Sequence, residues 1–296
     1  MSDQAEKLRR LRLIEGTAPS DSLPPFGPRP SARSIAVVSG KGGVGKSALV
    51  ANLALALARR GKKVLLVDGD LSLANVDLLF GLVPKFNLGD VVFGQRTIEE
   101  ILLTTPDGVR LLPAASGVEE LADLDEFRRE RLVRELSRLE ADLDLLLIDT
   151  GSGIGSQTLH WARAADRTLV VTTPEPTAFA DAYAMIKVLA GRKLRELPAL
   201  LVNMVNSARD GRETARRIRV VSERFLGFRP ELLGWVPFDD AFPRAVRQQE
   251  PLLRMFPHSP SALAISKIAE HLVFEPVPRD PIAVEPEGYF LKVANG

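Results

Sequence analysis

Residues 34–60, SIAVVSGKGGVGKSALVANLALALARR, place a glycine-rich loop between an apolar strand and an amphipathic helix. The loop satisfies the phosphate-binding pattern G-x-x-x-x-G-K-S/T in the strand-to-helix context that this pattern requires. Its glycines let successive backbone N–H groups converge on phosphate oxygens, and the helix N-terminus adds positive potential. A plain glycine-rich turn is the alternative, which the Lys46–Ser47 pair disfavours. The residues expected to form the site are Gly40, Lys41, Gly42, Gly43, Val44, Gly45, Lys46, Ser47 and Ala48.

The composition narrows the class of protein. The 296 residues are 45% hydrophobic, which is typical of a globular protein with a sizeable core. The 39 basic and 38 acidic residues nearly cancel, so bulk charge favours neither a nucleic acid nor a membrane. No cysteine occurs, which excludes disulfides, thiolate zinc sites and iron–sulfur clusters. The charged N-terminus lacks a signal-peptide core and no long apolar run follows, so we expect a cytoplasmic protein without a transmembrane span.

Apolar strand-like runs alternate with helical patterns from residue 34 onward. Such runs are apolar throughout, which predicts strands buried on both faces of a mostly parallel sheet with helices on both sides. We therefore predict one doubly wound α/β domain over residues 34–274. The expected strands are SIAVVS (34–39), KVLLVD (63–68), GVRLLP (108–113), DLLLID (144–149), RTLVVTT (167–173), PALLVNM (198–204) and ELLGWVP (231–237).

The segments outside the domain have different compositions. Residues 2–14 have Ala5, Leu8 and Leu11 on one stripe among basic residues, which predicts a short amphipathic helix at 1–14. Residues 15–33 are rich in Pro, Gly and Ser and are expected to be a flexible linker. The helix is expected to bind a partner; packing on the domain is the alternative. Residues 275–296 are rich in proline and are expected to form a C-terminal tail.

Carboxylates follow two of the expected strands. Asp149 follows the apolar run of LLLIDT, and Asp68 and Asp70 follow that of VLLVDGD. Because the ends of parallel strands meet at one edge of a sheet, these groups should face the phosphate loop. Asp68, Asp149 and the Ser47 hydroxyl suit a Mg²⁺ shell, Lys46 suits the β- and γ-phosphates, and Asp70 suits the attacking water. For Asp70, an Asx turn that leaves the strand is the alternative.

Three motifs together resemble the deviant Walker A ATPases of the MinD/ParA family: KGGVGKS, VDGDLSLANVDLLFGL and DTGSGIG. The resemblance covers the domain from Ser34 to about residue 274 and implies ATP and Mg²⁺ as ligands. It implies that Lys41 crosses an ATP-sandwiched homodimer to the partner's nucleotide, where it would neutralise transition-state charge as an arginine finger does. A surface lysine is the alternative.

The same resemblance implies contacts to the rest of the nucleotide. Glu175 would reach across the dimer toward the ribose, and Asn203 would contact the adenine edge. Pro237 and Asp239 lie in a segment similar to the loop that closes over the base. From chemistry alone, Asn203 at a strand end is a cap or turn residue about as often as a ligand contact.

The N-terminus contains the motif D-Q-A-x-x-L-R, and in this it is similar to the flagellar-number regulators in the MinD branch, the FlhG group (also called FleN or YlxH). This resemblance implies a slow, dimer-dependent ATPase that controls flagellar number and placement through an FlhF-type GTPase. Flagellar switch-ring proteins and a transcription activator are further implied partners. The alternative is a MinD-like division-site or ParA-like DNA or cargo positioning ATPase. The motif D-Q-A-x-x-L-R falls on Asp3, Gln4, Ala5, Leu8 and Arg9.

Two further segments bear on membranes and nucleic acids. The proline-broken, partly acidic tail disfavours a lipid-binding helix, and peripheral attachment at the inner membrane face or cell pole is the alternative to a purely cytoplasmic location. The arginine-rich segment 209–229 has interleaved acidic residues. These favour a solvated face or protein-docking surface over DNA binding, so no sequence-specific nucleic acid is expected.

Overall fold

The computed structural model describes residues 32–70, 76–113, 126–192, 194, 196–274 and 288–295. The expected N-terminal helix and most of the expected linker lie outside the described residues. The expectations for Asp3, Gln4, Ala5, Leu8 and Arg9 therefore remain predictions.

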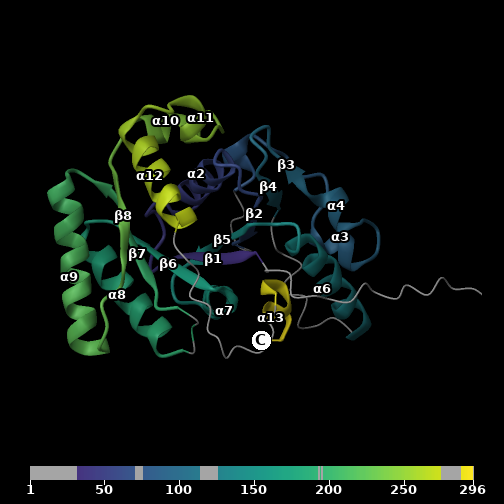
Figure 1. Ribbon diagram of the computed structural model, residues 1–296, viewed down its shortest axis with the longest axis horizontal. Coiled ribbons are helices and arrows are strands. Elements are labelled where there is room, and N and C mark those ends of the chain that lie inside the picture. Colours follow the sequence, from purple (N-terminus) through teal and green to yellow (C-terminus); the bar gives the residue numbers. More distant parts are fainter. Residues whose placement is uncertain are drawn as a thin grey trace, which may run out of the picture.

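An eight-stranded sheet forms the centre of the domain, with the order β3-β4-β2-β5-β1-β6-β7-β8 (Figure 1). All neighbouring strands are parallel except β3, which pairs antiparallel with β4. The predicted doubly wound α/β fold is confirmed; the two-residue strand β3 escaped prediction because it is too short to show a pattern. The strands are β1 (Arg33–Ser39), β2 (Val64–Gly69), β3 (Leu103–Thr104), β4 (Arg110–Leu112), β5 (Leu145–Ser152), β6 (Arg167–Thr172), β7 (Ala199–Val205) and β8 (Leu232–Pro237).

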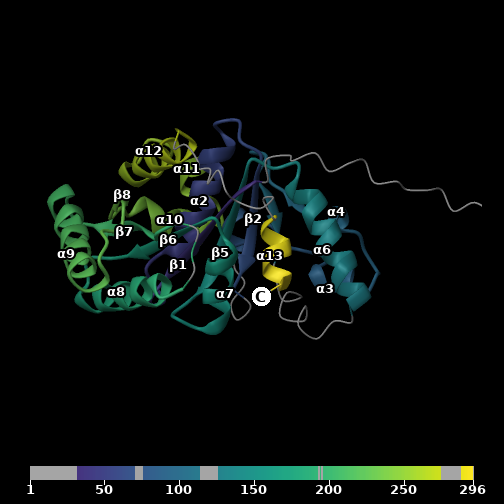
Figure 2. The same cartoon turned by 60° about the horizontal axis from the view of Figure 1, so that its bottom comes forward.

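Helices cover both faces of the sheet, and each face has its own hydrophobic core (Figure 2). Strand β1 shows why: Ala36 and Val38 join one core, while Ile35 and Val37 join the other. One layer contains η1 (Leu78–Phe80), α2 (Lys46–Ala58), α10 (Ala241–Arg247), α11 (Leu252–Met255) and α12 (Pro260–Phe274). The other contains α3 (Leu88–Val92), α4 (Ile98–Ile101), α6 (Glu126–Glu140), α7 (Ser156–Ala164), α8 (Pro176–Ala190), α9 (Ala208–Leu226) and α13 (Tyr289–Asn295).

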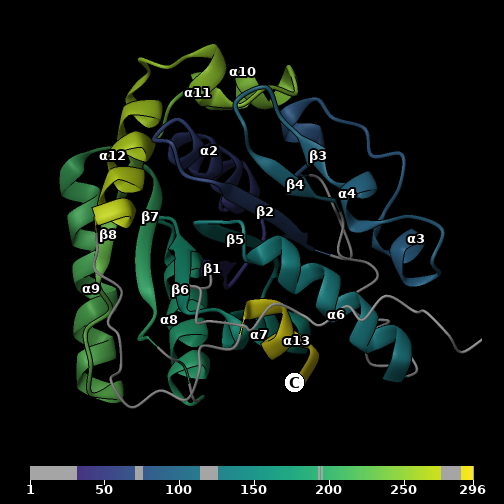
Figure 3. The same cartoon turned by 45° about the vertical axis from the view of Figure 1, so that its right-hand side comes forward.

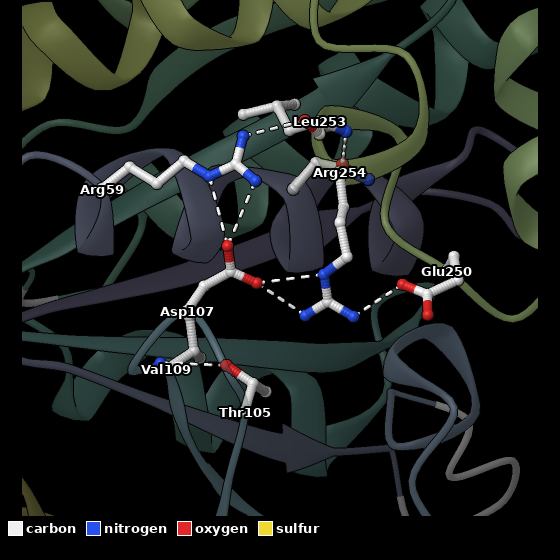
Figure 4. Close-up of polar contacts among 8 residues, drawn as sticks. Arg59, Thr105, Asp107, Val109, Glu250, Leu253 and Arg254 are labelled. Carbon is white, nitrogen blue, oxygen red and sulfur yellow. Dashed lines mark hydrogen bonds and ion pairs between the residues drawn. The ribbon is translucent and has the colours of Figure 1, made fainter.

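Helix α2, which follows the phosphate loop, is held by neighbours on most sides. The sequence predicted an amphipathic helix, but residues 49–57 of α2 are all buried. An ion-pair cluster fixes its C-terminal end: Asp107, in the turn between β3 and β4, accepts hydrogen bonds from Arg59 and Arg254 (Figure 4). At the middle of the helix, Asn52 accepts a hydrogen bond from the backbone N–H of Leu253 at 3.0 Å.

Helix α13 lies within the segment expected to be a tail, and it packs against α6 and α7 (Figure 3). Its side chains Tyr289, Phe290 and Val293 are buried. The buried carboxylate of Glu140 accepts hydrogen bonds from the backbone N–H groups of Tyr289 and Phe290, at 2.8 and 3.4 Å. The proline-rich sequence gave no sign of this docking.

Candidate nucleotide site

The phosphate loop joins the end of β1 to the start of α2, as the sequence predicted. Gly43 and Gly45 have φ values of 81° and 78°, in the left-handed region that favours glycine. Gly40 is needed for a different reason, because a Cβ atom there would lie 2.3 Å from the carbonyl oxygen of Asp181 in α8. The loop is thus fixed by its own backbone and by close contact with α8.

Lys46, Ser47 and Asp149 meet at the buried end of the loop. The Nζ atom of Lys46 lies 2.5 Å from Oδ1 of Asp149 and also donates to the carbonyl oxygen of Thr150. Burial raises the pKa of Asp149, an effect opposed by the Lys46 charge and by a hydrogen bond from Ser47. The Oδ2 atom of Asp149 is buried without a hydrogen-bond partner among the described residues. An orphan carboxylate oxygen beside a hydroxyl fits the hard oxygen donors that Mg²⁺ prefers.

Asp68 and Asp70 lie at the same edge of the sheet. In the parallel register, Asp68 is opposite Asp149 and Gly69 is opposite Thr150. The two oxygens of Asp68 accept backbone hydrogen bonds from Asp70 and Val76, at 3.1 and 3.2 Å. The half-buried Asp70 carboxylate is next to Gly151, where an added Cβ would lie 3.7 Å from its Oδ1 atom. The structure therefore brings the three predicted carboxylates together.

The first lysine of the loop has a different environment from the second. The Nζ atom of Lys41 lies 2.6 Å from Oε2 of Glu175 and 3.1 Å from Oγ1 of Thr177, both at the start of α8. The side chain of Lys41 is 31% exposed, whereas that of Lys46 is 7% exposed. The resemblance implies that Lys41 and Glu175 contact the nucleotide of a partner subunit. In this structure they instead pair with each other, within one chain, at the rim of the site.

Asn203 and its neighbour support the loop from β7. The buried amide of Asn203 donates to the carbonyl oxygen of Val44 at 2.8 Å, so in this structure it braces the loop backbone. Met204 has a left-handed backbone, with φ of 56°, and its Cε atom would lie 3.1 Å from a Cβ on Gly45. Sequence reasoning missed Met204. Its conformation, rare for a non-glycine residue, has no sequence signal.

Asp239 organises the segment that follows β8. Its carboxylate accepts hydrogen bonds from the backbone N–H groups of Ala241 and Ser261, at 2.9 and 3.1 Å. Burial would raise the pKa of Asp239, but these bonds outweigh it and lower the pKa below its usual 3.8. Pro237 accepts a hydrogen bond from the Ser261 hydroxyl at 2.8 Å through its carbonyl oxygen. Both predicted residues therefore fix the starts of α10 and α12.

The fold and the loop define a P-loop nucleotide-binding protein. Residues 35–252 match the family model of the CobQ/CobB/MinD/ParA nucleotide binding domain. Because this match covers more than half of the 296 residues, the chain belongs to that family.

The chain is similar to several named proteins over most of its length. The chain is 40% identical to antiactivator FleN of Pseudomonas aeruginosa over 247 residues, which are 83% of this chain and 88% of that protein. It is 34% identical to the flagellum site-determining protein YlxH of Helicobacter pylori over 280 residues, 92% of this chain and 91% of that protein. A solved structure of MinD complexed with Mg-ADP, from Pyrococcus horikoshii, has a TM-score of 0.66 and 28% identity. The match covers 81% of this chain and 96% of that MinD chain. Among the described residues, no helix has both the length and the apolar character needed to span a bilayer.

Proposed function

We propose that this chain is a cytoplasmic, Mg²⁺-dependent ATPase that forms a face-to-face homodimer on ATP and returns to the monomer after slow hydrolysis. The separate placement of its two loop lysines carries this proposal. Lys46 is buried beside Asp149, where it serves the chain's own nucleotide, whereas Lys41 stands at the rim. A cation at the rim is suited to a phosphate brought by a second subunit.

Each residue of the site then has a role. Lys46 neutralises charge on the β- and γ-phosphates, Lys41 does so from the partner subunit, and Asp70 orients the attacking water. Bound Mg²⁺ supplies positive charge that stabilises the phosphate oxygens during transfer. The residues that would hold the metal are Ser47, Asp68 and Asp149.

The remaining contacts recognise the nucleoside. Asn203 would contact the adenine edge, Glu175 would contact the ribose across the dimer, and Pro237 and Asp239 would support the loop over the base. Asn203 donates to Val44 with its amide nitrogen in the present structure. Its amide can therefore signal occupancy of the base site to the phosphate loop.

Sizing the protein with ATP tests the switch. Asp70→Ala should remain able to bind Mg·ATP but hydrolyse it slowly, so a dimer should accumulate in size-exclusion chromatography with light scattering. The wild type should form a dimer only transiently with ATP and remain a monomer with ADP. A persistent Asp70→Ala monomer at saturating Mg·ATP would contradict the proposal.

We further infer that the output is control of flagellar number and placement, through an FlhF-type GTPase and flagellar switch-ring or transcription partners. The similarity to FleN and YlxH over most of the chain supports this inference. The D-Q-A-x-x-L-R motif would supply the contact with the GTPase. Deleting residues 2–9 should abolish stimulation of an FlhF-type GTPase while the Kd for ATP stays unchanged. Undiminished stimulation would exclude this role for the segment.

A further inference from the structure

Trp161 of α7 is buried directly behind the edge of the sheet that carries the site carboxylates. Its side chain is 1% exposed. A Cβ atom added to Gly69 would lie 3.1 Å from Nε1 of Trp161 and 3.1 Å from the carbonyl oxygen of Asp149. A side chain at position 69 would press on the indole, since 3.1 Å is tighter than an ordinary van der Waals contact.

Gly69 is the residue between Asp68 and Asp70. Its neighbour across the sheet is Thr150, which follows Asp149. The indole therefore lies beside Gly69, the residue that joins Asp68, in β2, to Asp70, which follows β2. Side chains in a protein interior are close-packed, so a shift of the indole is transmitted to this backbone.

The other side of Trp161 is covered by helix α13. The rings of Trp161 and Tyr289 are stacked, with centroids 6.1 Å apart and planes inclined by 9°. The Tyr289 hydroxyl donates to the carbonyl oxygen of Trp161 at 3.4 Å, and Tyr289 is itself 1% exposed. Tyr289 therefore packs against the indole through both its ring and its hydroxyl.

Polar contacts at both ends of α13 hold the stack in place. Glu140 caps the N-terminal end through the backbone N–H of Tyr289. Lys292 pairs with Asp166 at 3.0 Å, and the ring of His160 contacts the carbonyl oxygen of Val293 at 3.0 Å. The position of Tyr289 over Trp161 is therefore specified by several independent contacts.

We propose that Trp161, held by Tyr289, is a positioning residue for ATP hydrolysis, fixing the strand end that presents Asp68 and Asp70 to the nucleotide. On this proposal, helix α13 stabilises the hydrolytic site because its Tyr289 holds Trp161 in place. The inference rests on the proposed ATPase function. The physical reason is geometric, because a displacement of about 1 Å at reacting groups can cost about 100-fold in rate.

Positioning predicts a split between turnover and binding. Tyr289→Ala, on the peripheral helix, should lower kcat by at least about tenfold while the KM for Mg·ATP changes less than about threefold. Tyr289→Phe keeps the stacked ring and should stay within about threefold of wild-type kcat, whereas Trp161→Phe removes the Nε1 edge beside Gly69 and should lower kcat as Tyr289→Ala does. Trp161→Phe also removes an indole N–H that has no acceptor among the described residues, so it should not lower stability through a lost hydrogen bond.

Leu272→Ala is the matched control, because Leu272 is 2% exposed in α12, in the opposite hydrophobic layer. It should lower the melting temperature without the loss of kcat. An unchanged kcat in Tyr289→Ala would overturn the proposal. The proposal would also be overturned if Leu272→Ala lost as much kcat as Tyr289→Ala, or if Tyr289→Ala raised the KM for Mg·ATP at constant kcat.

Fluorescence distinguishes this inference from the ATPase proposal. The chain has two tryptophans, so Trp235→Phe leaves Trp161 as the sole emitter. Adding Mg·ATP should change its emission, and Tyr289→Ala should remove most of that change. Absence of turnover in the wild type would refute the proposed ATPase. The emission of Trp161 on Mg·ATP binding would then be the remaining test of the positioning role. Unchanged emission on Mg·ATP binding would overturn the positioning role.

Discussion

The ammonium group of Lys41 lies 2.6 Å from the carboxylate of Glu175 in the same chain. The two side chains are 31% and 64% exposed, and exposed ion pairs contribute about 0–1 kcal/mol. A pair this weak holds Lys41 in place in the absence of nucleotide, but a triphosphate can replace Glu175 as the partner of Lys41. On the proposed function, this contact is the starting position from which Lys41 would move on dimerisation.

Lys41→Ala should separate binding from assembly. Because Lys46 and the loop backbone remain, the Kd for Mg·ATP should change less than about tenfold. The ATP-dependent dimer should be lost and hydrolysis should fall by at least about 1,000-fold, the lower end of the range for loss of an arginine finger. Sizing and phosphate-release assays check both, with Lys63→Ala at an exposed position as the charge-matched control. A normal dimer formed by Lys41→Ala would place this lysine outside the interface.

Gly40→Ala should disrupt the contact between the phosphate loop and α8. The added methyl group would lie 2.3 Å from the carbonyl oxygen of Asp181, which is backbone and cannot rotate away. Overpacking of this kind costs about 1–3 kcal/mol or more, so the melting temperature and the affinity for Mg·ATP should both fall. Gly191→Ala, at the end of the same helix with its nearest neighbour at 3.6 Å, should be tolerated. Equal behaviour of the two variants would refute the packing argument.

Asp107→Asn should destabilise the fold in a pH-dependent way. Burial would raise the pKa of Asp107, but hydrogen bonds from Arg254 and Arg59 outweigh burial and lower the pKa below 3.8 (Figure 4). A lowered folded-state pKa gives stability that is present above the unfolded-state value and is lost as the pH falls through the folded-state value. The variant should therefore be less stable by about 1–3 kcal/mol at pH 7, a difference that shrinks below pH 3.8.

Urea unfolding at several pH values measures this difference. Glu213→Gln is the control, because Glu213 pairs with Arg216 and Arg217 on the fully exposed side of α9. Its pKa is lowered to about 2, but solvent screening should leave stability nearly unchanged at pH 7. A difference for Asp107→Asn that persists undiminished in acid would show that charge is not its origin.

Helix α9 should not bind DNA. Acidic side chains neutralise part of its basic face: Glu213 pairs with Arg216 and Arg217, and Glu223 lies 2.6 Å from Arg229, which follows the helix. Fluorescence anisotropy with duplex DNA, with and without Mg·ATP, should show no binding near physiological salt. Binding whose logarithm falls linearly with log salt, with a slope of several units, would instead support a ParA-like role.

The sequence by itself determined the class of fold and the outline of the site. Seven apolar runs predicted β1, β2, β4, β5, β6, β7 and β8, because strands buried on both faces are apolar throughout. The loop pattern and the strand-end positions of Asp68 and Asp149 located the phosphate edge, since parallel strands end together. These features are local in the chain, so local pattern was sufficient to find them.

Tertiary structure alone decided the contacts between distant segments. The pairing of Lys41 with Glu175 and the bracing of Val44 by Asn203 join residues more than 100 positions apart. The docking of α13 under Trp161 contradicts what its proline-rich surroundings suggest, because burial of Tyr289 depends on a surface built by α6 and α7. Periodicity records whether a residue is apolar, whereas packing against a particular neighbour depends on the shape of the assembled core.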